Sequence, residues 1–383
     1  MKRIKSIYSF FLSVTVLFSM FTWFSSGNIV YAKPSWVPVG TAGFSASPFR
    51  EPSFAIDNGT PYVAFQDWEN DHKATVMKFN ATSSSWELVG TAGFSPGPAY
   101  NLSLVINNGT PYIAFQDKSN NKVTTMKFNG TSSSWELVGT LGESPHPADE
   151  FSLAVDKGIP YIALQEWENN RKLTVMKFNS ISSSWEPIGT TSLSAYTAVD
   201  PSLVIDKGTP YLAFSDWNNN YKATVLKYNG TSSSWKPVGT AGFSTGPAYV
   251  SFVIDNGTPY IAFADDKNAK VIIMKFNSTS SSWKPIKTTG LSSYTVTNLC
   301  LAVDKGTPYV AFQDLGKNNK ATVLKFNNTN SSWNLVGIRA FSSGPAYSIS
   351  FAIDKGTPYV AFTDDGNNGR ATVMKFPTPT AGK

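Results

Sequence analysis

Three tryptophans of this chain directly follow an acidic residue, and these pairs are the residues best suited to bind a ligand. They are Asp67-Trp68, Glu166-Trp167 and Asp216-Trp217. An indole face can pack against the CH groups of a sugar ring while an adjacent carboxylate accepts hydrogen bonds from the hydroxyls. We expect the three indoles to be exposed, because Lys118, Asp266, Leu315 and Asp365 take their place in other parts of the chain. The pattern predicts a carbohydrate-binding surface.

Aromatic residues in nearby loops extend this candidate surface. The strongest candidates are Tyr100, Tyr249 and Tyr347, and equivalent loops carry Phe49, Tyr196 and Tyr294. Two interpretations remain open for this set: the rings contact a ligand, or they fill gaps between structural units.

The acidic residues belong to a regular series followed by a basic one. The acids are Asp67, Asp117, Glu166, Asp216, Asp265, Asp314 and Asp364, and the bases are Lys73, Lys122, Lys172, Lys222, Lys270, Lys320 and Arg370. In one interpretation each acid caps a turn and pairs with the base across it, a contact worth about 0–1 kcal/mol when exposed. In the other, the acids bind sugar hydroxyls or a cation. Calcium needs several oxygens per site, and no dense acidic run supplies them, so we predict no metal and no cofactor.

Residues able to perform catalysis are few. The only histidines are His72 and His146, and the acids outside the regular series are Glu51, Asp71, Asp149, Glu150, Asp200 and Asp266. A pair of these carboxylates would suit glycoside hydrolysis, and His146 with Arg50 or Arg171 would suit a polysaccharide lyase. Irregular loops collect such residues in any protein, so we favour a binding protein over an enzyme and assign no catalytic residue.

The elements that must position these residues are repeats of about fifty residues. The phrase Gly-Thr-Pro-Tyr recurs with small variations, placing tyrosines at 62, 112, 161, 211, 260, 309 and 359. A Ser-Ser-Trp phrase places tryptophans at 86, 135, 185, 235, 283 and 333, and Trp36 opens the series. A constant period of this length is typical of a solenoid, a propeller or an array.

Each repeat contains four short stretches of β-forming residues separated by turn residues. In the first repeat they are 52–57, 61–67, 73–79 and 86–89, and Asn58-Gly59 predicts a tight hairpin between the first two. Four antiparallel strands in fifty residues make one propeller blade. The repeated Tyr62, Phe65 and Trp86 positions supply apolar surface for packing blade against blade.

The two ends of the chain predict a closed ring. The first repeat unit is a lone Trp strand at 36–40, and the last unit, 349–376, lacks that strand. Together they make one blade, so both sheet edges are covered. We therefore predict an all-β, seven-bladed propeller over residues 33–376, closed by the N-terminal strand, with a disordered tail at 377–383.

Residues 1–32 read as a signal peptide: basic residues, an apolar run, and Val30-Tyr31-Ala32 as a cleavage site. Removing them leaves 29 basic against 26 acidic residues, and these are interspersed, so we expect no nucleic-acid partner. No further apolar run predicts membrane insertion. The single cysteine, Cys300, replaces a serine of other repeats and is interpreted as a packing residue. We expect a secreted, extracellular monomer.

The repeated phrases resemble the tandem-repeat β-propellers of secreted bacterial proteins, related in architecture to kelch, WD-repeat and tectonin-type lectin propellers. The resemblance covers residues 35–376, but the Gly-His and Trp-Asp pairs of WD repeats, the double glycine of kelch and the sialidase box are all missing. It therefore implies a propeller and a binding role without a specific site. We expect lectin-like recognition of carbohydrate or cell-envelope polymer; the alternatives are a polysaccharide-degrading lyase or glycoside hydrolase, and a protein-interaction platform.

Overall fold

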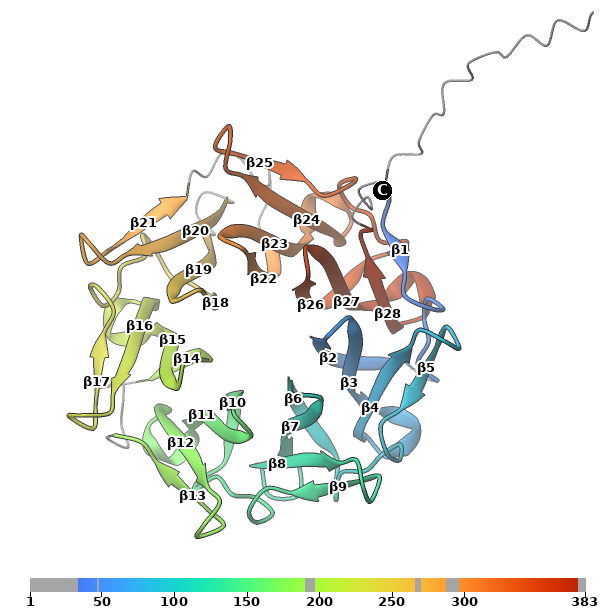
Figure 1. Cartoon of the computed structure of the whole chain (residues 1–383), viewed down its shortest axis with the longest axis horizontal. Coiled ribbons are helices and arrows are strands. Elements are labelled where there is room, and N and C mark those ends of the chain that lie inside the picture. Colours follow the sequence, from blue (N-terminus) through green and yellow to red (C-terminus); the bar gives the residue numbers. More distant parts are fainter. Residues whose placement is uncertain (1–33, 47, 190–196, 266–269, 287–295, 378–383) are drawn as a thin grey trace, which may run out of the picture. The chain divides into compact units, whose positions relative to one another are not determined.

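The computed structural model describes residues 34–46, 48–189, 197–265, 270–286 and 296–377, and these form seven four-stranded antiparallel sheets arranged as blades of a ring (Figure 1). The predicted all-β, seven-bladed propeller is confirmed. Blade 1 consists of β2 (Phe49–Asp57), β3 (Thr60–Asp67), β4 (Lys73–Asn80) and β5 (Ser85–Leu88). Its innermost strand begins three residues earlier than predicted, and the register shifts between Arg50 and Ser53. Residues 1–32, predicted to be a signal peptide, and nearly all of the tail predicted to be disordered lie outside the described residues.

The other blades repeat this order from the centre of the ring outward. Blade 2 is β6 (Ala99–Asn107), β7 (Thr110–Asp117), β8 (Lys122–Asn129) and β9 (Ser134–Leu137); blade 3 is β10 (Ala148–Asp156), β11 (Ile159–Glu166), β12 (Lys172–Asn179) and β13 (Ser184–Pro187); blade 4 is β14 (Ala198–Asp206), β15 (Thr209–Asp216), β16 (Lys222–Asn229) and β17 (Ser234–Pro237). Blade 5 is β18 (Val250–Asp255), β19 (Thr258–Asp265), β20 (Lys270–Asn277) and β21 (Ser282–Ile286); blade 6 is β22 (Val296–Asp304), β23 (Thr307–Asp314), β24 (Lys320–Asn327) and β25 (Ser332–Leu335).

Blade 7 joins the two ends of the chain, as predicted. It consists of β26 (Ala346–Asp354), β27 (Thr357–Asp364) and β28 (Arg370–Lys375), with β1 (Val37–Pro38) as its outermost strand. Val37 lies opposite Lys375, and the Val39 amide donates to the Val373 carbonyl at 2.8 Å. Figure 1 shows β1 beside β28. The N-terminal strand therefore closes the ring and leaves β28 without an open edge.

The repeated tryptophans connect neighbouring blades by their ring nitrogens as well as by packing. Six of these ring nitrogens donate to a carbonyl oxygen of the preceding blade: Trp36 to Val336, Trp86 to Val39, Trp135 to Val89, Trp185 to Val138, Trp235 to Ile188 and Trp283 to Val238, at 2.7–2.9 Å. In several blades a phenylalanine stacks on the indole, as Phe44 does on Trp86 with 4.1 Å between ring centroids. These clamps explain why the Ser-Ser-Trp phrase recurs with almost constant spacing.

The innermost strands are joined by a serine in most blades. The Ser53 hydroxyl of blade 1 accepts a hydrogen bond from the Leu104 amide of blade 2 at 2.8 Å. Cys300 takes the same position in blade 6, where its thiol donates to the Ile349 carbonyl of blade 7 at 3.1 Å. Burial raises the pKa of the Cys300 thiol to about 12. These contacts support its interpretation as a packing residue.

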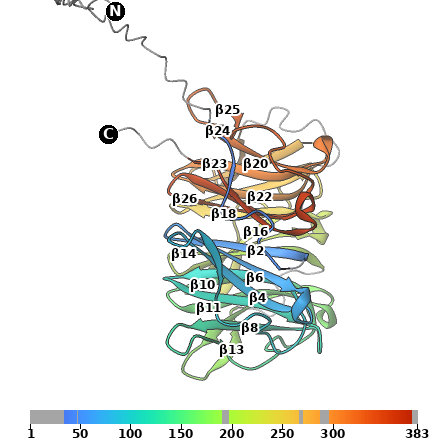
Figure 2. The same cartoon turned by 90° about the vertical axis from the view of Figure 1, so that its right-hand side faces the viewer.

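The strands run across the ring between two faces, seen edge-on in Figure 2. The hairpins between second and third strands lie on one face with the loops that connect successive blades. The amide of Ala99 donates to the carbonyl of His72 at 2.9 Å, which joins such a loop to such a hairpin. We call this the tryptophan face, because it carries Trp68, Trp167 and Trp217. The hairpins between first and second strands, and between third and fourth strands, lie on the opposite face, which we call the hairpin face.

Candidate functional site

In five blades the loop between the second and third strands forms a single 3-10 turn, which the sequence did not predict, and three of these turns begin with a candidate tryptophan. The five turns are η1 (Trp68–Asn70), η2 (Trp167–Asn169), η3 (Trp217–Asn219), η4 (Leu315–Lys317) and η5 (Asp365–Asn367). In η3 the Asp216 carboxylate accepts from the Asn218 amide at 3.1 Å and from the Asn219 side chain at 2.8 Å. Asn220 then ends the turn in the left-handed conformation, with a φ of 55°. Each turn projects its first side chain from the tryptophan face.

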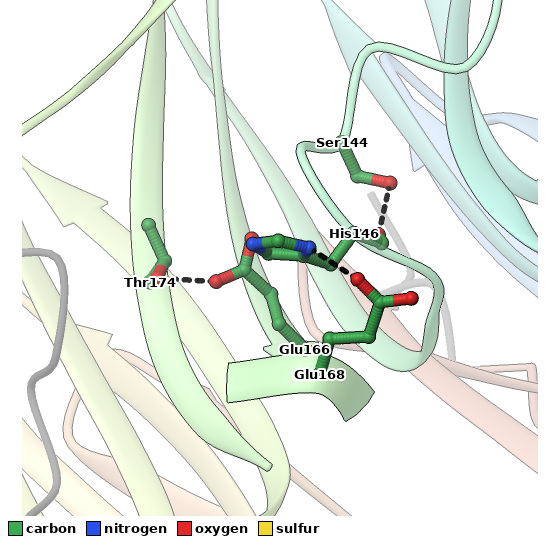
Figure 3. A network of polar contacts seen from close by, with 5 residues as sticks. All are labelled: Ser144, His146, Glu166, Glu168 and Thr174. Carbon is green, nitrogen blue, oxygen red and sulfur yellow. Dashed lines mark hydrogen bonds and ion pairs between the residues drawn. The ribbon is translucent and has the colours of Figure 1, made fainter. Parts of the chain in front are cut away.

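The acids that precede these turns are buried. Asp67, Glu166 and Asp216 expose only 6%, 2% and 7% of their surface. Thr75 and Thr224 donate their hydroxyls to Asp67 and Asp216 at 2.8 and 3.1 Å, and Thr174 donates to Glu166 at 3.0 Å (Figure 3). The prediction that the acids stabilise the turn is therefore confirmed for Asp67 and Asp216, whereas contact of the acids with a ligand stays a prediction.

The predicted pairing of these acids with the basic series is not found in the described part of the chain. Lys73 lies directly opposite Asp67 in the strand register, yet no ion pair joins the two side chains. The physical reason is that turn amides and a threonine hydroxyl occupy the buried carboxylate. Asp314 is different, because the Nε of Arg339 contacts its Oδ2 at 2.6 Å.

The three candidate tryptophans are exposed, as predicted. The exposed fractions are 41% for Trp68, 39% for Trp167 and 50% for Trp217, compared with 7% for the clamp residue Trp36. Trp217 packs edge-on against Tyr221, with 5.0 Å between centroids, and Trp68 lies 5.6 Å from the His72 ring. The indoles are therefore held by a neighbouring ring in blades 1 and 4 while much of their surface faces solvent.

The candidate tyrosines lie on the same face but nearer the centre of the ring. Tyr100 and Tyr347 belong to the innermost strands of blades 2 and 7, and Tyr249 immediately precedes that of blade 5. Tyr249 and Tyr347 are 68% and 41% exposed, whereas Tyr100 is half-buried with the Lys118 ammonium 5.6 Å above its ring. Tyr196, Tyr294 and the side chain of Phe49 lie outside the described residues. The exposure of Tyr249 and Tyr347 favours ligand contact over gap filling.

Blades 3 and 4 bring together several of the acids outside the regular series. The Asp200 amide of blade 4 donates to Oε2 of Glu150 in blade 3 at 2.6 Å. Burial raises the pKa of Glu150 to about 7, the charges of Asp200 and Asp149 add to the shift, and Arg171 opposes it. Burial also raises the pKa of Asp200. Glu150 and Asp200 lie near the start of innermost strands, at the end of the blades that belongs to the tryptophan face.

The combination of His146 with Arg171, suggested for a lyase, is not found in contact among the described residues. Nδ1 of His146 contacts Oε2 of Glu168 in η2 at 2.9 Å, and the two side chains are 41% and 64% exposed (Figure 3). The positive charge of Arg171 instead lowers the pKa of Glu150 and so partly opposes the effect of burial. The side chain of Arg50 lies outside the described residues. In the described part of the chain no group of three or more His, Cys, Asp or Glu side chains is arranged to hold a metal ion.

Sequence reasoning missed a set of grooves on the hairpin face. Their volumes are about 830, 540, 490, 460 and 370 Å³. Each contains one lysine from a third strand: Lys227, Lys127, Lys325, Lys275 and Lys177, in the same order. In four of them the ammonium lies 5.1–5.5 Å above the ring of a tyrosine in the second strand. The recurring Lys-Phe-Asn phrase was the available signal, but the opposing walls come from different blades.

Comparison with known proteins identifies the fold and no family. No protein-family model matches the chain, and no curated protein matches its sequence. A solved structure entitled "Structure of YjhT" matches with 12% identity and a TM-score of 0.50, covering 73% of this chain and 95% of that one. In all, 1043 chains of solved structures match, so the shape is widely shared. No helix in the described residues is long and apolar enough to cross a membrane. The chain is thus similar to known propellers in architecture alone.

Proposed function

We propose that this protein is a secreted, lectin-like binding protein that recognises carbohydrate or cell-envelope polymer through repeated sites on its tryptophan face. The observation that carries the proposal is the exposure of Trp68, Trp167 and Trp217, between 39% and 50%, at the same position of three blades. Residues 1–32 are its proposed secretion signal.

The physical argument begins with the contrast between two classes of tryptophan. Indoles such as Trp36 are buried and hydrogen-bonded between blades, so their conservation from repeat to repeat is explained by stability. The exposed indoles contribute little to the core, and charged residues replace them in blades 2 and 7 without loss of the fold. A broad, rigid aromatic face in solvent is suited to stack on a sugar ring. Repetition then raises avidity by about 10²–10⁴ on a multivalent polymer.

The experiment changes Trp68, Trp167 and Trp217 to Ala together. The control changes Lys118, Leu315 and Asp365 to Ala, which alters the same turn position in three blades that have no indole there. Both proteins are compared with wild type on immobilised glycans and by thermal melting. We expect the triple Trp variant to lose binding with little change in melting temperature, and the control to bind normally. Intact binding with a large fall in melting temperature would contradict the proposal.

One observation favours a second candidate function, a polysaccharide-cleaving enzyme. Glu150 has a raised pKa beside Asp200, and a carboxyl group kept protonated near neutral pH can act as a general acid. Turnover of a polysaccharide that Glu150→Gln or a change of His146 abolishes would establish the enzyme and refute the binding protein. A protein-interaction platform is the third possibility, and capture of a defined protein by the tryptophan face, with no glycan bound, would identify it.

A further inference from the structure

The lysines of the hairpin face differ between blades in the residue that lies directly opposite them. In blades 1 to 3 the partner across the outer strand pair is a glutamate: Lys78 lies opposite Glu87, Lys127 opposite Glu136 and Lys177 opposite Glu186. In blades 4 and 5 the partner is a second lysine: Lys227 lies opposite Lys236, and Lys275 opposite Lys284. Two adjacent blades therefore carry a like-charged pair where three others carry a neutral one.

These pairs matter because directly opposite side chains in an antiparallel sheet have Cβ atoms about 4.5–5.5 Å apart. Opposite charges at this separation attract, and like charges repel. Glu87, Glu136 and Glu186 are also tied to the sheet by the side chains of Asn80, Asn129 and Asn179 at 2.6–2.9 Å. Blades 4 and 5 lack this asparagine–glutamate hydrogen bond and place two like charges opposite each other. An anion bound between the two ammonium groups would remove that repulsion.

The paired lysines line two of the grooves. The groove of about 830 Å³ between blades 4 and 5 contains Lys227, Lys236, Asn229 and Tyr228, and faces Phe276 and Ser281 of the next blade. The groove of about 460 Å³ on blade 5 contains Lys275, Lys284, Asn277 and Thr279. No carboxylate is among the described residues that line either groove. Both volumes fall in the range of small-ligand sites.

We propose that these two grooves bind the anionic groups of an acidic polysaccharide, carboxylate or phosphate, between the paired lysines. The aromatic walls would pack against the sugar, and the asparagine and hydroxyl groups would bind its polar atoms. The polysaccharide part of this proposal rests on the proposed function, whereas the preference for anions rests on the grooves alone. Since the grooves lie on the hairpin face, this site is separate from the tryptophan face.

The test uses the double variant K236E/K284E, which gives blades 4 and 5 the lysine–glutamate pair found in blades 1 to 3. A matched control, K317E/K355E, changes the net charge equally at two exposed lysines that line none of the described grooves. The probes are polygalacturonate, poly(glycerol phosphate), neutral dextran and single-stranded DNA. Affinities are measured at low and high salt, because exposed charge contacts are screened. Melting temperatures are recorded to exclude unfolding.

We expect wild type to bind one or both acidic polymers at least tenfold more tightly than dextran, and to lose most of this preference at high salt. An exposed charge contact changes affinity by about one- to fivefold. Each substitution removes an attraction to the polymer anion and adds a repulsion, so K236E/K284E should bind the acidic polymers about tenfold more weakly. Its melting temperature should be unchanged or higher. The affinities for polygalacturonate and poly(glycerol phosphate), compared with each other, show whether carboxylate or phosphate is preferred.

Equal binding of acidic and neutral polymers, or an equal loss in K236E/K284E and in its control, would overturn the anion site. Single-stranded DNA bound as tightly as the acidic polymers, with the same loss, would overturn the polysaccharide part. The triple Trp variant separates this inference from the proposed function. If the triple Trp variant loses dextran binding but keeps its lysine-dependent preference for acidic polymers, the proposed function and the anion site are both supported. If binding depends on the lysines and never on the tryptophans, only the anion site is supported.

Discussion

Glu143 is a polar residue at a position where four other blade junctions have a phenylalanine. Phe44, Phe94, Phe243 and Phe341 stack there on a clamp tryptophan, Phe94 with 4.3 Å between its centroid and that of Trp135. In Glu143 both carboxyl oxygens are buried without a well-formed hydrogen bond, as is the Thr125 hydroxyl oxygen. We predict that Glu143→Phe stabilises the protein.

The size of the effect follows from the pKa. Burial raises the pKa of Glu143 from 4.5 to about 8, and the Thr125 hydroxyl only partly offsets the shift. A carboxyl with a raised pKa holds its proton more tightly in the folded state, so the free energy of unfolding falls as the pH rises from 4.5 to 8. At pH 7 the linked cost is about 3 kcal/mol relative to pH below 4. A restored aromatic stack would add about 0.5–1.5 kcal/mol.

The assay is thermal or denaturant unfolding of wild type, Glu143→Gln and Glu143→Phe between pH 4 and pH 8. Both variants should lose the part of the downward slope that Glu143 contributes, whereas the part contributed by Glu150 and Asp200 should remain. Glu143→Phe should also melt higher at pH 7, by about 4 °C for a domain of this size. An unchanged pH slope in both variants would refute the assignment of a buried, protonated Glu143. A stability loss in Glu143→Phe alone would show that the site cannot accept a ring.

Two further predictions concern how the ring is held together. A chain that starts at residue 47 lacks β1, so it should expose the edge of β28 and melt at a lower temperature or aggregate. Removal of residues 378–383 should leave the melting temperature unchanged. Equal stability of the two truncated proteins would contradict ring closure. Trp235→Phe keeps an aromatic ring but removes the 2.9 Å hydrogen bond to the Ile188 carbonyl, so it should lower the free energy of unfolding by about 1 kcal/mol in denaturant melts. A loss no larger than that of Trp217→Phe on the surface would argue against the clamp.

The fold was predictable because every repeat gives the same local signals and the two ends are complementary. Asn58-Gly59 marked a hairpin, and the lone strand around Trp36 marked the closure. Exposure of Trp68 also followed from sequence, since charged residues tolerate the same position elsewhere.

The orientation of the acidic side chains that precede the 3-10 turns was not predictable in the same way. The sequence did not show whether Asp216 bonds to its own turn, and only the positions of the turn amides and Thr224 reveal this contact; contact with a ligand stays a prediction. The grooves were missed for a related reason. In the sequence Lys236 is an ordinary polar residue of a strand, and only the pairing of β17 with β16 shows that it lies opposite Lys227. Phe276 lines the same groove because blade 5 packs beside blade 4.

The central claim is that repeated indoles of the tryptophan face bind carbohydrate. The most direct measurement is a calorimetric titration of the protein with a neutral oligosaccharide, taken from a glycan that the protein binds. It compares wild type with the variant in which Trp68, Trp167 and Trp217 are changed to Ala. The account predicts about three equivalent sites in wild type, none in the variant, and similar melting of both proteins. An unchanged stoichiometry and affinity in the variant would contradict it.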